Sequence, residues 1–331
     1  MKKNIGKVLL ACASCLALWA CGTSPAEESV AAEIKEDIPA KTSSWAMNIR
    51  EETIEVEGLS KEYRYLYITD MHIVADNGAD AEDVKQYASE RMPQFVNAEA
   101  VTAKEQFPDW IEYANQMRPD GVLLGGDLID SPSDSNVDFL KTQLEELQVP
   151  YLYGLGNHDW TYPWDYMTDR GKEAYLPKLE PYMQSSPYIQ SYETEEFLIV
   201  AVDNSSNQVA PEALEEYKQL LQKGKPVIVM LHVPLYTEAV LEKAKEVWGS
   251  PAILGGGVHG GIYPNEVSTE FLELTKADDS PVVAVLAGHI HLYHRDMLKE
   301  KIVQIVGDAG YKGEAIWLRL VPANASSAET E

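Results

Sequence analysis

Residues 122–130 read Val-Leu-Leu-Gly-Gly-Asp-Leu-Ile-Asp. The first three are a short apolar run typical of a buried strand, and an aspartate follows two glycines later. Including this one, five apolar runs are each followed by Asp, Asn or His: 65–68, 121–124, 151–153, 227–231 and 282–286. Because ligands bind beyond the carboxyl ends of strands in open α/β sheets, we expect these polar residues to share one site.

Apolar runs alternate with amphipathic helical stretches over residues 46–322, and no linker rich in Pro, Gly or Ser interrupts them. Further strands are predicted over 197–202 and 302–306, and helices over about 80–91, 101–117, 134–147, 212–223, 237–248 and 266–276. The helices lie between strands, which indicates an α/β fold in one domain. The strands from about residue 282 onward follow one another closely, so we expect them to pair as hairpins.

The chain is strongly acidic. Its 331 residues include 53 Asp and Glu against 27 Lys and Arg, a net charge of −26. This balance disfavours a nucleic-acid-binding surface, which needs a basic face, and it disfavours adhesion to anionic lipids. Three cysteines are too few for a disulfide framework.

The N-terminus has the features of a bacterial lipoprotein leader. A basic stretch (1–7) precedes an apolar run (8–20) that is too short to span a bilayer. The run ends Leu18-Trp19-Ala20-Cys21, which resembles a lipobox and predicts a signal peptide over 1–20 with lipid attached to Cys21. An ordinary secretory signal is the alternative.

The segments that flank the domain are poor in large apolar residues. Residues 21–45 are predicted to be a flexible tether, and residues 323–331 a disordered tail, because their composition cannot bury enough surface to order them. Together with the leader, they predict an extracytoplasmic protein that contacts a bacterial membrane only through its lipid anchor.

The polar residues after the strands are nitrogen and oxygen donors without a thiolate. They are Asp70, His72, Asp127, Asn157, His232, His289 and His291. Such a set suits Mn, Fe, Zn or Ni rather than copper(I) or an iron–sulfur cluster. Two pairs, at 70/72 and 289/291, are spaced by two, which places both members on one side of an extended chain. Glycines precede Asp127, Asn157 and His289, where we expect tight turns or close backbone approach.

These motifs resemble the calcineurin-like metallophosphoesterase family. The matching blocks are Asp-x-His at 70–72, Gly-Asp-x-x-Asp at 126–130, Gly-Asn-His-Asp at 156–159, a lone histidine at 232 and Gly-His-x-His at 288–291. The resemblance implies a four-layer α/β/β/α sandwich. It also implies hydrolysis of a small phosphorylated substrate, a phosphodiester or a phosphomonoester, by a hydroxide shared between two metal ions.

The same resemblance assigns a role to each residue. Each metal ion has four ligands, with Asp127 as the bridge: Asp70, His72, Asp127 and His291 for one, and Asp127, Asn157, His232 and His289 for the other. His158 is expected to contact the phosphate and protonate the leaving group, and Asp159 to orient its ring. Purple acid phosphatases carry Tyr where this chain has Asp130, which disfavours that class.

Three further features are less specific. The glycine-rich loop 255–261 contains His259, which we expect either to touch phosphate or to lie on a mobile surface loop. The aromatic residues over 160–166 are predicted either to stack on the substrate or to pack in the core. The segment 73–110 is longer than a strand–helix unit needs, and we interpret it as a cap insertion.

A solute-binding lipoprotein, which captures a ligand for a transporter, is the alternative from another functional class. An anchor, a tether and an acidic surface all fit such a protein. It has no need, however, for a set of metal ligands with His158 beside them. The sequence therefore favours an enzyme and leaves its oligomeric state open.

A lipid on Cys21 predicts membrane association that depends on the thiol of this residue. Cys21→Ser should release the protein from membranes or leave it unprocessed, because the lipid is attached through sulfur. The intact mass of the membrane-bound form measures this directly. A wild-type membrane form without diacylglycerol on Cys21 would contradict the prediction.

Overall fold

The computed structural model describes residues 45–162, 164, 167–249 and 252–323. The predicted leader, Cys21, nearly all of the tether and nearly all of the tail lie outside the described residues, so these remain predictions. Within the described ranges, no helix is both long and apolar enough to cross a membrane.

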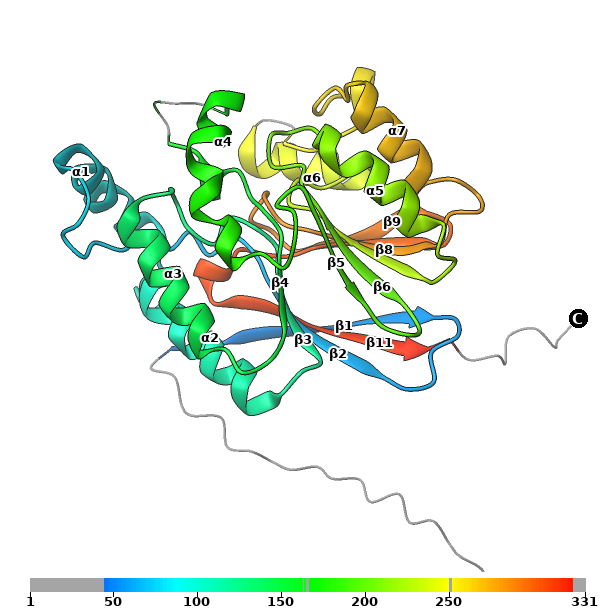
Figure 1. The fold of residues 1–331 in the computed structure, drawn as a ribbon, viewed down its shortest axis with the longest axis horizontal. Coiled ribbons are helices and arrows are strands. Elements are labelled where there is room, and N and C mark those ends of the chain that lie inside the picture. The colour runs from blue at the N-terminus through cyan, green and yellow to red at the C-terminus, as the bar shows by residue number, and fades with distance from the viewer. Residues whose placement is uncertain (1–44, 163, 165–166, 250–251, 324–331) are drawn as a thin grey trace, which may run out of the picture. The chain divides into compact units, whose positions relative to one another are not determined.

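Two β-sheets form the centre of the fold (Figure 1). In spatial order, the five-stranded sheet consists of β1 (Asn48–Val56), β11 (Glu314–Pro322), β2 (Tyr63–Ile68), β3 (Gly121–Leu124) and β4 (Tyr151–Tyr153). The six-stranded sheet consists of β5 (Ile189–Glu193), β6 (Leu198–Val202), β7 (Val227–Met230), β8 (Val282–Ala287), β10 (Ile302–Val306) and β9 (His294–Lys299).

Each sheet contains a run of parallel strands. β2, β3 and β4 are parallel neighbours, and so are β6, β7, β8 and β10. Ile68 pairs with Leu124 and Leu124 with Tyr153, so these strands end level with one another. The hairpin expected after residue 282 forms between β9 and β10, whereas β8 pairs with β10 in parallel.

Side chains that alternate along the strands fill two different cores. On β2, Leu66 and Ile68 pack with Phe107 and Trp110 of an outer helix. Tyr65 and Tyr67 instead enter the core between the sheets, which also contains Met230 of the opposite sheet. Successive strand residues point to opposite faces. A strand buried on both faces therefore reads as a continuous apolar run, as the sequence predicted.

Helices cover the outer faces of both sheets (Figure 1). α2 (Ala103–Met117) and α3 (Asp134–Glu146) belong to the core of the first sheet. α5 (Pro211–Leu221) and α7 (Glu266–Thr275) belong to the outer core of the second, and α6 (Glu238–Trp248) packs on the ends of β8 and β10. This arrangement confirms the α/β/β/α sandwich.

Local sequence sets the helix boundaries. Thr102 caps α2 through a capping box in which its side chain accepts from the backbone N–H of Glu105. The side chain of Ser133 caps α3 by accepting from the backbone N–H of Asn136. α1 (Glu82–Arg91) lies in the segment between β2 and α2, and α4 (Asp169–Tyr175) lies between β4 and β5. The six predicted helices are present, and α4 was not predicted.

Candidate metal centre

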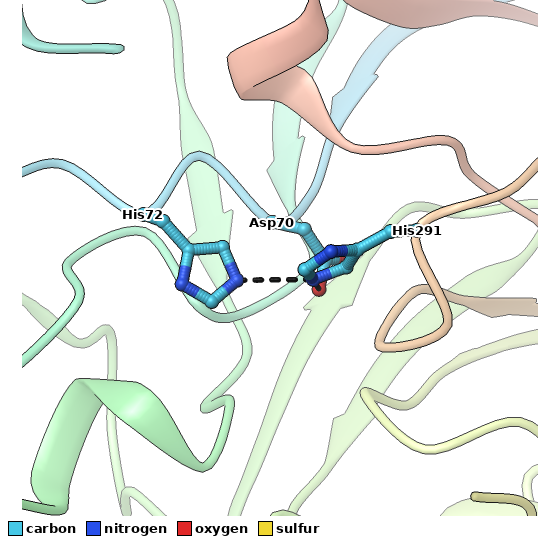
Figure 2. A group of neighbouring side chains, drawn as sticks. All are labelled: Asp70, His72 and His291. Carbon is cyan, nitrogen blue, oxygen red and sulfur yellow. Dashed lines mark hydrogen bonds and ion pairs between the residues drawn. The ribbon is translucent and has the colours of Figure 1, made fainter. Parts of the chain in front are cut away.

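The carboxyl ends of five parallel strands meet at one site. Within four residues of its end, each is followed by at least one predicted metal ligand: β2 by Asp70 and His72, β3 by Asp127, β4 by Asn157, β7 by His232, and β8 by His289 and His291. Figure 2 shows Asp70 and His72, from the loop after β2, and His291, from the loop after β8, pointing toward one another. Nε2 of His72 lies 3.1 Å from Nε2 of His291.

The ligand atoms fall into two groups that match the predicted halves of the centre. Asp70, His72 and His291 form one, and Asp127, His232 and His289 form the other, with all ligand atoms of a group within 4.8 Å of one another. The Oδ2 atom of Asp127 lies 3.2 Å from Nε2 of His232 and 3.6 Å from Nε2 of His72. One carboxylate oxygen thus faces both groups, as a bridging ligand must.

Asn157 provides a test of whether these residues fit metal ions. Its side-chain oxygen Oδ1 is buried and has no hydrogen-bond partner. A buried carbonyl oxygen without a partner destabilises the fold by about 1–3 kcal/mol, so this arrangement needs a compensating ligand. A cation beside Asp127 would satisfy the oxygen, and the oxygen and imidazole donors around it suit a divalent or trivalent ion.

The backbone at the site is strained. Five of the seven ligands adopt a left-handed conformation, with φ between 48° and 70°: Asp70, His72, Asp127, His289 and His291. Non-glycine residues rarely adopt such angles, and they cluster at functional sites when they do. The pairs at 70/72 and 289/291 therefore do not converge by the alternation of an extended chain, which corrects the sequence-based reason for their convergence.

Glycines allow the ligand loops to approach one another closely, as expected. A Cβ on Gly156 would lie 2.2 Å from Oδ1 of Asp127, and a Cβ on Gly288 would lie 2.3 Å from Oδ2 of Asp70. No side chain fits at either position without moving a ligand. The backbone N–H of His289 donates to both oxygens of Asp70, at 3.0 and 2.9 Å, which ties the first and last motifs together.

Hydrogen bonds behind the ligands orient the histidine rings. Nδ1 of His232 lies 3.0 Å from the carbonyl oxygen of Gly125, and Nδ1 of His72 lies 3.1 Å from Oδ1 of Asp130. Each contact engages Nδ1, which leaves Nε2 free to face the centre. Asp130 therefore supports a ligand from behind.

Arg91, which lies in none of the predicted motifs, supports Asp130. Its Nε and Nη2 atoms each donate to a different oxygen of that carboxylate at 2.7 Å. The Phe95 ring stacks on His72 with 4.4 Å between ring centroids. Both residues come from the segment 73–110, which thus packs behind the metal ligands. This differs from its interpretation as a cap.

Asn204 is a second supporting residue that was missed. Its Oδ1 accepts from the backbone N–H groups of His232 and Val233, both at 3.0 Å, and its Nδ2 donates to the carbonyl of Val233 at 2.7 Å. This side chain fixes the turn after β7. Asn204 follows the predicted strand 197–202 as the ligands follow theirs, so the same sequence signal could have identified it.

Charges in the centre are buried and mutually compensating. Burial opposes the charged form of His232, but the carboxylate of Asp127 outweighs it and raises the pKa of His232 to about 10. Burial and the neighbouring His232 lower the pKa of His289 to about 3. In the metal-free site, a proton on His232 rather than on His289 therefore offsets negative charge of the carboxylates. Metal binding has to displace that proton.

His158 and Asp159 occupy different surroundings. The His158 ring lies over Asp130, with Nδ1 3.3 Å from its Oδ1, and the His158 backbone N–H donates to Oδ1 of Asp127 at 2.7 Å. Asp159 instead accepts the backbone N–H groups of Gly156, Asp127 and Ile129 at 2.7, 3.0 and 3.1 Å. Asp159 thus ties two ligand loops together, which differs from the contact expected with the His158 ring.

A pocket of about 220 Å³ opens onto the centre. Its lining is Asp127, Asn157, His158, Trp248, Ala252, His289 and His291. His259, expected as a possible phosphate contact, is not among these residues. It is exposed, and its ring stacks on Tyr236 at 6.1 Å. Of the aromatic residues after His158, Trp160 is fully buried, and Trp164 stacks on Tyr162 outside the pocket.

The model of the calcineurin-like phosphoesterase family matches residues 63–293. The match covers more than half of the chain and all seven predicted ligands. The chain belongs to the calcineurin-like phosphoesterase family. Since this family uses a dimetal centre, the protein is a metal-dependent phosphoesterase with residues that can hold such a centre.

Two solved structures to which this chain is similar are described as phosphatases. A purple acid phosphatase from yellow lupin seeds shares 15% identity, with a TM-score of 0.51, over 82% of this chain and 48% of that one. A dimetal phosphatase from Danio rerio shares 13% identity, with a TM-score of 0.46, over 76% of this chain and 88% of that one. This chain thus spans about half of the lupin enzyme, and that likeness supports the fold. No curated protein matches the sequence.

Gly156→Ala should weaken metal binding by about 10- to 100-fold, the range seen when residues that support metal ligands are lost. The added methyl group would collide with the Asp127 side chain at 2.2 Å. Titration of the metal-free protein with Mn or Zn measures the effect. Gly154→Ala is the matched control, because its Cβ would meet first the flexible end of Met230 at 3.2 Å. Equal affinities in the two variants would refute the close-approach argument.

Proposed function

We propose that this protein hydrolyses a small phosphate ester with two metal ions, outside the cytoplasm and anchored to a bacterial membrane through Cys21. The observation that carries the two-metal assignment is the position of the Asp127 carboxylate between the two ligand groups, 3.2 Å from His232 and 3.6 Å from His72. The leader sequence supports the location.

When bound, the two ions supply Lewis-acid chemistry: they make a water molecule nucleophilic at neutral pH and neutralise charge on the phosphoryl oxygens. The pocket depends on this contribution. Among the described residues that line it, none is Lys or Arg. A protein with a net charge of −26 therefore admits an anionic phosphate only where metal ions offset the acidic field.

His158 is placed to act on the leaving group. Its Nδ1 faces Asp130, so Nε2 is the atom left to deliver a proton to the departing oxygen. Burial opposes protonation, but the carboxylates of Asp127 and Asp130 outweigh it and raise the pKa of His158 to about 9. In the metal-free protein these carboxylates thus favour the imidazolium form, which becomes neutral imidazole after it gives up its proton.

Both metal ions should depend on Asp127. Asp127→Ala should lose both, because the bridge contributes to each site, whereas Asn157→Ala should mainly weaken one. Elemental analysis of protein purified in the presence of metal gives the stoichiometry. Asp278→Ala, at a side chain that is 99% exposed, is the control and should keep both. An Asp127→Ala variant that retains two ions, or a wild type with fewer than two, would contradict the assignment.

His158→Ala should lose rate according to the leaving group and keep its metal. General acid catalysis contributes about 10²–10⁴-fold, and an alkoxide needs the proton far more than a nitrophenolate does. Alkyl phosphate esters should therefore lose much more rate than nitrophenyl esters.

His232→Ala is the comparison variant, because it should lose metal and slow both substrates alike. Equal losses on both ester types in His158→Ala, at full metal content, would reduce His158 to a phosphate-positioning residue. Loss of metal from His158→Ala would show that the assigned ligands are wrong.

A further inference from the structure

Trp248 is the aromatic residue among those that line the metal-centre pocket, and no catalytic motif contains it. It is the last residue of α6, and Gly249 ends the helix after it in a left-handed conformation with φ of 64°. The indole is 48% exposed, which is high for a side chain as large and apolar as tryptophan. This exposure occurs beside the metal ligands, which suggests a role in binding.

The indole ring is fixed although it is exposed. Its Nε1 donates to the carbonyl oxygen of Ile290 at 2.7 Å, and its ring meets the His291 ring edge-on at 5.2 Å. The polar atom of the side chain is thus satisfied by the protein. What remains for a ligand is apolar ring surface, held in one orientation at the mouth of the pocket.

The rest of the pocket limits what can lie against that surface. Ala252, from the segment after α6, is also apolar, while the other lining residues are Asp127, Asn157, His158 and two metal-ligand histidines. No described lining side chain is a cation that would hold a second phosphate or a carboxylate. A volume of about 220 Å³ corresponds to about seven water molecules, which suits a phosphate with one ring.

We propose that Trp248 stacks on the organic group of the ester, so that the enzyme prefers phosphate esters of an uncharged aromatic or heteroaromatic group. This inference rests on the proposed function, since it names the substrate class of the same site. Stacking on an indole face tolerates many rings, because it requires only a planar π surface. Inorganic polyphosphates gain nothing from this contact, because they have no organic group to lie on the indole.

Non-hydrolysable phosphonates test the contact without any contribution from the leaving group. Calorimetry should measure the affinity of the metal-loaded protein for phenylphosphonate and for methylphosphonate. We expect tighter binding of the phenyl compound, and Trp248→Ala should reduce the ratio of the two affinities by about 5- to 50-fold. Binding of methylphosphonate and metal content should stay near the wild-type values.

Two further variants separate stacking from support of the loop. Trp248→Phe keeps a ring but loses the bond to Ile290, so it should retain most of the phenyl preference. Trp164→Ala removes a tryptophan with a closely similar exposed fraction, 47%, that does not line the pocket, and it should leave the ratio unchanged.

Three results would overturn the proposal: a wild type without phenyl preference, a Trp248→Ala variant in which both affinities fall equally, or a Trp248→Phe variant that behaves like Trp248→Ala. The last two would limit Trp248 to support of the loop that carries His289 and His291. Phosphonate binding with the expected ratios, but without hydrolysis of any ester, would instead refute the proposed reaction and support the subsite.

Discussion

The need to hold seven nitrogen and oxygen donors together, with Asp127 facing both ligand groups, is the constraint on which the rest of the structure depends. These groups would repel one another or remain solvated in a flexible chain. Five of them also adopt left-handed backbone angles, each of which costs roughly 1–3 kcal/mol. Only a surrounding structure that overdetermines the loops can maintain such a site in the absence of metal.

The two sheets supply that structure. Parallel strands in each sheet end level with one another, so the first residues beyond them start from fixed positions at one edge. Buried carboxylates then connect the loops. Asp159 joins the loop of Asp127 to the loop of Asn157, and Asp70 joins its own loop to the loop of His289. Asp159 therefore serves as a structural brace, and Asp70 combines that role with the predicted one of metal ligand.

The sequence predicted those strands and site residues whose pattern lies within a short stretch of the chain. Strands buried on both faces read as apolar runs, and the ligands follow them directly, so both were accessible. β1, β5 and β9 were missed because each lies at a sheet edge and contains several charged or polar residues, so none reads as a continuous apolar run. β11 contains a readable apolar run, 315–318, that the prediction did not use. Arg91 could not be found because its role depends on a contact with Asp130 that no spacing indicates.

Residues within the motifs and residues outside them thus have different roles in the proposed chemistry. The motifs contain the predicted metal ligands and the proposed proton donor, and they say little about the group attached to the phosphate. The segment 73–110, although long enough for a cap, supports His72 from behind through Phe95 and reaches Asp130 through Arg91. Discrimination between substrates therefore depends on the end of α6, where Trp248 contacts both the pocket and the loop of the last two histidines. Trp248 thus lies against the loop of two predicted metal ligands as well as against the pocket. For this reason, affinity for the organic group has to be measured separately from metal content.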